Sequence, residues 1–194
     1  MDPRFAAAVE AIDAVNATDP VLLSVDGQSV PKEVEHARRM TAWVGRLDPE
    51  ATDLQLLAAR AHHLRRWEVP RTEYPEGRAG YLRWRSNQKK RHAEEVGAIL
   101  TGCGYSEEEA SRVGAIIRKE GLGRDPQVQT HEDAICLVFV ELQFVEVAEK
   151  LGDEKMVEVV RKTLKKMSPR AVEATLALPL DPHSRSLVEQ AAAL

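Results

Sequence analysis

Four histidines and one aspartate are spaced along the sequence so that nearly every one falls on a different predicted helix. They are His36, the adjacent pair His62 and His63, His92, and Asp133. Imidazole nitrogens and carboxylate oxygens are the usual protein ligands of Mn, Fe, Co, Ni and Zn ions. Helical bundles hold such ions with side chains from several facing helices. The spacing therefore predicts a site for a divalent transition metal, with these five residues as its ligands.

Each of these residues also has a simpler interpretation. A single histidine on a helix is more often a hydrogen-bonded core or surface residue than a ligand, and no spacing here forms a local signature such as HExxH. Asp133 could be an acid favoured by the dipole at a helix N-terminus, with His131 in the same turn. His183 is expected at the surface. The predicted metal site therefore depends on the combination of residues.

The middle of the chain is basic although the whole chain is acidic. Residues 60–92 contain ten lysines and arginines against three glutamates, whereas the formal net charge is −4. His62 and Arg66 would share one face of a helix, and Arg85 and Lys89 recur at helical spacing before His92. We expect Arg66, Arg85 and Lys89 to bind the phosphate of a substrate. The alternative is a solvated, salt-bridged surface.

Two acids and three aromatic residues complete the predicted site. Glu95 or Glu132 is expected to assist as a catalytic base. Trp67, Tyr81 and Trp84 lie beside arginines in the sequence. Such pairs can stack on a nucleotide base, or they can be core aromatic residues with paired arginines.

Helices must position these residues, because apolar side chains recur at three and four positions in almost every segment. The predicted helices cover about residues 5–15, 31–46, 49–67, 78–101, 106–119, 128–151 and 153–166, followed by two shorter ones. Side chains that cap helix N-termini are expected at the starts of several of these helices. They are Asp48, Ser106, Asp153, Ser168 and Asp181.

Residues 135–140, ICLVFV, could form a buried strand by their composition. The preceding capping signal and the spacing of the following glutamates favour a helix instead. Residues 21–30 contain Asp26 and Gly27, a turn signal, and no second strand is predicted to pair with the first. The expected fold is therefore an all-α, single-domain bundle of about eight helices over residues 1–194.

The composition is that of an ordinary globular protein, with 43% hydrophobic and 30% charged residues. No run of 18 apolar residues predicts a membrane span, and the N-terminus lacks the pattern of a signal peptide. Cys103 and Cys136 are expected as small core residues in a reducing compartment. We therefore expect a cytoplasmic protein without membrane contact, and the acidic balance argues against wholesale nucleic-acid binding.

The order of the predicted ligands resembles that of the HD-domain superfamily. In that superfamily an all-helical fold binds one or two divalent metals through the pattern H…HD…D, and many members hydrolyse phosphate esters of nucleotides. The matching positions are His36, His62–His63 and Asp133, and His92 matches the additional histidine of two-metal versions. The pair here is His-His, which removes the carboxylate that bridges two metals and argues against a two-metal centre.

A second resemblance covers nearly the whole chain. The run AARAHHLRRWEVPRTEYPEGRAGYLRWR and the motifs KKRHAEE, HEDAICLVFVE and RKTLKKMS are similar to the uncharacterised family called domain of unknown function 4202. These motifs are long and unusual, so the resemblance is specific. It implies a shared fold and brings no settled activity.

Three functions follow from these observations. The leading hypothesis is a metal-dependent phosphohydrolase that acts on a nucleotide or another phosphorylated small molecule. The second is a non-catalytic helical module that binds RNA or a phosphorylated ligand, with a degenerate HD-like site. The third is a domain for partner binding or homodimer formation, in which the polar cluster is structural.

Overall fold

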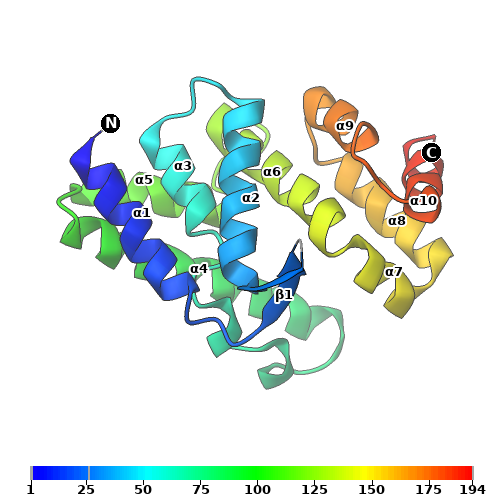
Figure 1. The fold of residues 1–194 in the computed structure, drawn as a ribbon, viewed down its shortest axis with the longest axis horizontal. Helices are drawn as coiled ribbons and strands as arrows, with labels where there is room; N and C mark the ends of the chain where they lie inside the picture. The colour runs from blue at the N-terminus through cyan, green and yellow to red at the C-terminus, as the bar shows by residue number, and fades with distance from the viewer. Residues whose placement is uncertain (1, 26, 194) are drawn as a thin grey trace.

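The computed structural model describes residues 2–25 and 27–193, which form ten α-helices and one short hairpin (Figure 1). The all-α class predicted from the sequence is confirmed. The helices are α1 (Pro3–Asn16), α2 (Lys32–Leu47), α3 (Asp53–Arg60), α4 (Gly77–Gly102), α5 (Glu107–Arg118), α6 (Pro126–Leu142), α7 (Phe144–Leu151), α8 (Asp153–Leu164), α9 (Pro169–Leu176) and α10 (Pro182–Ala192). Among these described residues, no helix is both long enough and apolar enough to cross a bilayer.

The hairpin is a pair of strands that the sequence did not predict. Strands β1 (Leu22–Val25) and β2 (Gln28–Pro31) are antiparallel, with Leu23 opposite Val30. Gly27 has φ +78°, a left-handed conformation suited to such a turn, and Asp26 lies outside the described residues. The hairpin leads directly into α2 and so fixes where that helix begins.

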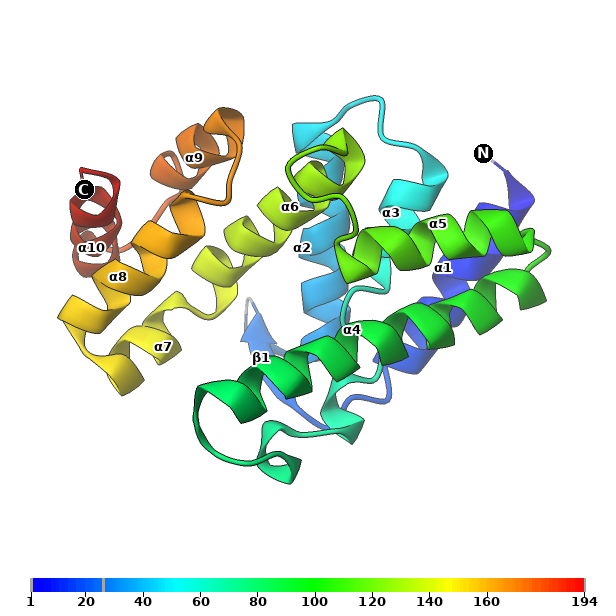
Figure 2. The same ribbon diagram turned by 180° about the vertical axis from the view of Figure 1, so that it is seen from behind.

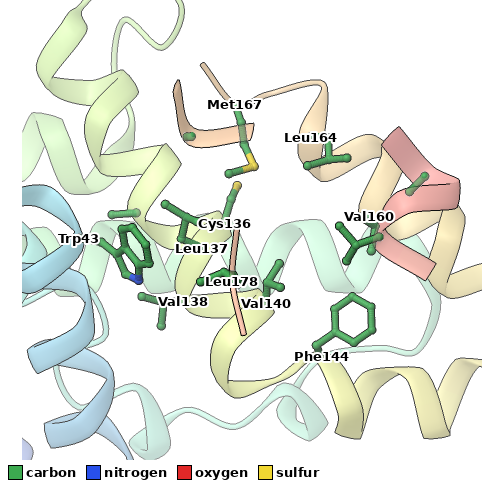
Figure 3. Packing of buried hydrophobic residues seen from close by; sticks show 14 of the residues in the cluster. Trp43, Cys136, Leu137, Val138, Val140, Phe144, Val160, Leu164, Met167 and Leu178 are labelled. Atoms are coloured by element: carbon green, nitrogen blue, oxygen red, sulfur yellow. The ribbon is translucent and has the colours of Figure 1, made fainter. Parts of the chain in front are cut away.

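The buried apolar residues form two clusters. Figure 2 shows α1, α3 and α5 on one side of α2 and α6, and α8, α9 and α10 on the other. One cluster is built by α1, α3, α4 and α5, with Val128 from the start of α6. The other joins α2 and α6 to the C-terminal helices, and Figure 3 shows Trp43, Leu137 and Phe144 within it. Because α6 contributes to both clusters, its middle is buried on most sides, as the sequence predicted.

The third helix is shorter at both ends than predicted. It begins after Thr52, whose side chain accepts a hydrogen bond from the Gln55 N–H in a capping box, and Asp48 is not its cap. It ends at Arg60, and Arg65 adopts a left-handed conformation with φ +50°. The prediction that His62 and Arg66 share a helical face is therefore wrong. Both residues follow the helix, in a turn that presses Leu64 into the core.

The long core helix predicted over residues 128–151 is two helices, α6 and α7, separated at Gln143. The break turns Phe144 into the C-terminal apolar cluster, where it is 2% exposed (Figure 3). The caps at Ser106, Ser168 and Asp181 are confirmed. Asp153 is the first residue of α8 and does not cap it, because Gly152 holds the cap position.

Candidate metal and anion site

Five histidines converge at the centre of the molecule. His36 comes from α2, His62 and His63 from the turn after α3, His92 from α4, and His131 from α6. The rings of His36, His62 and His63 are close to parallel, and the His63 centroid lies 4.0 Å from that of His36 and 4.5 Å from that of His62. We call these five residues the histidine cluster. The structure thus brings together the four predicted histidines and adds His131, which the sequence analysis had assigned to a helix-start turn.

A buried glutamate, Glu33, completes one part of the histidine cluster. Its Oε2 lies 3.1 Å from Nδ1 of His63 and 3.9 Å from Nδ1 of His36. One ligand atom from each of these three residues lies within 4.8 Å of the other two. A carboxylate with two imidazoles at this spacing is a donor set suited to a divalent first-row metal.

The sequence analysis missed Glu33 although a local signal exists. Glu33 and His36 are three residues apart, and side chains at that spacing share one face of a helix. The N–H of Glu33 donates to Oδ2 of Asp19 at 3.0 Å, which anchors the first turn of α2 behind the hairpin. The hairpin and Asp19 therefore place the Glu33 carboxylate beside the histidines.

A hydrogen bond joins the rings of His131 and His62. Nε2 of His131 lies 3.1 Å from Nδ1 of His62, so one ring donates to the other. The second ring nitrogen of His131 is buried and has no hydrogen-bond partner among the described residues. A histidine bonded through one nitrogen presents the other in a fixed tautomer, which is how metal-binding histidines are commonly oriented. His131 is therefore placed to orient His62.

His92 is buried without satisfying either of its ring nitrogens. It is 2% exposed, and neither nitrogen has a hydrogen-bond partner among the described residues. Its ring lies 6.1 Å from that of His63, on the buried face of α4 that also carries Trp84 and Gln88. Buried polar groups without partners are rare in folded proteins. A ligand is one way to satisfy this ring.

The histidine cluster is neutral at physiological pH. Burial, and then cationic neighbours such as Arg66 and Lys119, lower the pKa of His36, His92 and His131 to about 3. The pKa values of His62 and His63 are also well below their ordinary value, first through burial. Neutral imidazole is the form that binds metal ions and the form that can stack without charge repulsion.

Burial shifts the pKa of the Glu33 carboxyl group upwards, whereas it shifts those of the histidines downwards. Burial raises its pKa to about 8, although Arg66 and Lys32 oppose that rise. A carboxyl held this far from water is costly to ionise unless a positive charge lies beside it. A bound cation would provide that charge.

Four residues of the histidine cluster form one end of a cavity of about 330 Å³, which we call the basic cavity; they are His36, His62, His63 and His92. Its walls come from α4, α6 and α8 and from the turns that follow α5 and α8. Ile135, Phe139 and Val159 give it an apolar side. Six cationic side chains line the rest: Arg66, Arg85, Lys89, Lys119, Lys162 and Lys166. A pocket of this size with few acids suits a small anionic molecule.

The three predicted phosphate-binding residues all line the basic cavity. The guanidinium of Arg66 lies 4.5 Å above the ring of Trp84, and that of Arg85 lies 5.7 Å from the ring of Tyr81. Lys89 has its pKa lowered to about 8, by burial and then by the charges of Lys119 and Arg85. Within the described residues none of the three has a carboxylate partner, so the alternative of a salt-bridged surface does not fit them.

The predicted aromatic residues divide between two roles. Nε1 of Trp84 donates to the carbonyl of Val69 at 2.9 Å, and Gln88 donates to the carbonyls of Arg66 and Val69. Trp84 is therefore a buried support that holds the turn after α3 against α4. Tyr81 lines the basic cavity and is 43% exposed, so its ring is accessible to a ligand.

Of the two predicted bases, only Glu132 faces the basic cavity. Glu132 is bound to the ammonium of Lys119, and its other oxygen lies 3.5 Å from Lys166. Burial opposes ionisation, but these two lysines hold the pKa of Glu132 below its ordinary value. Glu95 does not line the cavity and pairs with Arg91 at 3.1 Å. A carboxylate paired in this way is a weak acceptor for a substrate proton.

Asp133 does not join the histidines as predicted. Its Oδ1 accepts hydrogen bonds from the N–H of Ser168 and from Gln129, and its Oδ2 accepts from the hydroxyl of Ser168. His131 and Asp133 are two residues apart on α6, and side chains at that spacing do not face the same way. Asp133 therefore points towards the start of α9, and Glu33 is the carboxylate beside the histidine cluster.

The remaining histidine, His183, lies on α10 with its side chain 62% exposed. Its Nε2 lies 3.2 Å from Asp153. This surface position agrees with the sequence analysis. The sequence analysis also missed three cationic residues of the basic cavity, Lys119, Lys162 and Lys166. They come from segments far from the basic stretch of residues 60–92 and have no local signal.

A family model described as Domain of unknown function (DUF4202) matches residues 6–188 of the chain. This range contains every residue of the histidine cluster and of the basic cavity. No curated protein and no solved structure matches the chain.

Proposed function

Because this chain belongs to the family Domain of unknown function (DUF4202), whose description assigns no activity, we propose its function from the site alone. We propose that the protein is a metal-dependent phosphohydrolase that acts on a nucleotide or another phosphorylated small molecule. The observation that carries this proposal is the position of a three-residue donor set at one end of a cavity lined by six cationic side chains.

Glu33, His36 and His63 would hold the metal. His62 and His92 lie beside them, and His131 orients His62 through the hydrogen bond between their rings. A divalent ion in such a site polarises phosphoryl oxygens and lowers the pKa of a bound water. The nitrogens of His92, which have no hydrogen-bond partner in the described part of the chain, and the unfavourable ionisation of Glu33 support a ligand at this position.

The cations of the basic cavity would bind and orient the phosphate. Arg66, Arg85 and Lys89 have no carboxylate partners among the described residues, so their charge is free to balance that of a phosphate. Lys119 and Lys166 are already partly balanced by Glu132. Because Glu132 is engaged in this way, the proposal assigns it the role of holding these lysines and not that of a base.

The proposal is tested by the metal content of protein purified without a histidine tag. Wild-type protein is expected to contain about one divalent ion per chain and to hydrolyse members of a nucleotide panel with Mn²⁺, Co²⁺ or Ni²⁺. The His63→Ala variant is expected to lose both properties, because it removes one of the three donors. The His183→Ala variant, which changes an exposed histidine on α10, is the matched control and should retain both.

Absence of stoichiometric metal in the wild-type protein, together with no hydrolysis across the panel, would sink the proposal. Unchanged metal content in His63→Ala would show that the ligand set is wrong.

A second candidate function is a non-catalytic module that binds a phosphorylated ligand. It is favoured by the stacking of three histidine rings and by the pairing of Glu132 with lysines, which leaves no unpaired carboxylate among the described residues that line the basic cavity. In that case nucleotide binding would persist undiminished in excess EDTA, and the bound nucleotide would be recovered intact.

A further inference from the structure

A second basic groove adjoins the basic cavity and shares one of its walls. The shared residues are Arg85, Lys89, Lys119, Glu132 and Lys166. The groove has a volume of about 510 Å³ and extends away from the histidine cluster, between α4 and the turn that follows α5. We call it the outer groove.

The outer groove carries its own positive charge. Lys90 on α4 is exposed and has no carboxylate partner among the described residues. Arg118 also lines the groove and pairs with Glu120 at 2.7 Å. With the shared wall included, six cationic side chains face two carboxylates here, in a chain whose formal net charge is −4. The positive charge of this region is therefore local, and it continues outward from the basic cavity.

Apolar side chains also line both spaces, and they indicate what kind of ligand body would suit the site. Tyr81, Ile135 and Phe139 line the basic cavity, and their surfaces suit a planar or apolar body. The outer groove adds Leu82 and Leu122, which are 51% and 37% exposed. Each of the two spaces thus combines apolar and cationic side chains, and the wall between them is charged.

We propose, building on the proposed function, that the substrate is a small nucleotide that carries two separate phosphate groups. One phosphate lies in the basic cavity near the histidine cluster, where Arg66, Arg85 and Lys89 face it. The second lies in the outer groove, where Lys90 and Arg118 balance its charge. A long nucleic acid is disfavoured as the occupant, because the chain as a whole is acidic and such ligands require an extended basic surface.

The experiment compares the binding of AMP and adenosine 3′,5′-bisphosphate to the full chain by calorimetry. Wild-type protein is expected to bind the bisphosphate at least about tenfold more tightly, because only the bisphosphate fills the outer groove. Lys90→Gln is expected to remove most of this advantage while weakening AMP binding far less. Arg83→Gln is the matched control, because Arg83 is an exposed cation on the same helix that lines neither space, and it should behave as wild type.

Equal affinity of the wild-type protein for the two nucleotides would overturn this inference, as would equal losses for both nucleotides in Lys90→Gln. Tighter binding of a short single-stranded RNA than of the bisphosphate would overturn the small-molecule occupant. The experiment distinguishes a failure of this inference from a failure of the proposed function. Preferential binding of the bisphosphate by protein that holds no metal and hydrolyses no member of the panel contradicts the hydrolase and supports the two phosphate-binding positions. Hydrolysis of nucleotides without preferential binding of the bisphosphate supports the hydrolase and contradicts this inference.

Discussion

His92 is the residue at which stability and function oppose each other most directly. A buried imidazole with no hydrogen-bond partner destabilises a fold by about 1–3 kcal/mol, because it gives up its bonds to water and gains none. Its neighbours on the same face of α4 both donate to backbone carbonyls, Trp84 through Nε1 and Gln88 through Nε2. The cost at His92 is therefore specific to that ring, and it is offset when a ligand occupies the site.

The His92→Leu variant is expected to separate these two effects. Leucine has a similar volume and no polar atoms, so the metal-free variant should be more stable than wild type by about 1 kcal/mol in urea unfolding. Binding of AMP in the presence of Mn²⁺ should weaken by about tenfold or more. A variant that is less stable and binds AMP as wild type does would show that His92 has only a structural role.

Helix α6 directs the side chain of Asp133 towards the start of α9. The carboxylate binds both the backbone and the hydroxyl of Ser168, the residue that caps α9, and so ties α6 to the start of α9. Asp133 is 3% exposed, so the hydrogen bonds are shielded from water. It therefore holds the C-terminal helices to the core.

The Asp133→Ala variant is expected to lose stability and to keep its metal. Leaving the buried partners unsatisfied should lower the free energy of unfolding by about 2–3 kcal/mol, measured in urea. Metal content per folded chain, measured on protein purified without a tag, should match that of wild type. Loss of metal with unchanged stability would instead return Asp133 to the ligand set.

Local signals in the sequence were sufficient for most helices. Caps such as Ser106 and Ser168 depend on a side chain and a backbone N–H only two or three residues away, so the sequence predicts them well. The end of α3 and the break at Gln143 depend on distant contacts, which pull Leu64 and Phe144 into apolar clusters. A pattern of apolar spacing carries no record of such contacts, and both segments were predicted as continuous helix.

The candidate site was predicted in part for the same reason. Residue type and spacing identified four histidines and the three cations Arg66, Arg85 and Lys89. The direction in which a side chain points was the weaker part of the prediction. Two-residue spacing on α6 excludes Asp133 from the face that carries His131, and three-residue spacing on α2 brings Glu33 to the face that carries His36.

The whole molecule is expected to respond to acid through the histidine cluster. Each of these histidines has a lower pKa in the folded chain than in the unfolded chain, so the unfolded chain binds more protons. The stability that they contribute is fully present above about pH 6.5 and is lost as the pH falls, by about 1.4 kcal/mol per histidine and pH unit. Glu33 acts in the opposite sense, because its raised pKa favours the folded state at low pH and loses that effect as the pH rises through about 8.

Metal-free protein is therefore expected to unfold near pH 5, since several such groups exhaust a typical stability of about 5–15 kcal/mol within one or two pH units. Circular dichroism at stepped pH after EDTA treatment measures the midpoint. His92→Leu should shift the midpoint to lower pH and make the transition shallower by one proton, whereas His183→Ala should leave it unchanged. A midpoint below about pH 4 would contradict the neutral, buried state of the histidine cluster.

The basic cavity lies between two groups of helices that meet mainly through α2 and α6. Arg85 reaches it from α4 and Lys162 from α8, so like charges line the basic cavity from both groups. A bound phosphate would replace that repulsion with a contact common to both groups. Opening of α8 would then have to break the ligand's contacts as well, which raises its local opening free energy. Occupancy of the site should therefore slow amide hydrogen exchange in α8, a helix that carries none of the five histidines.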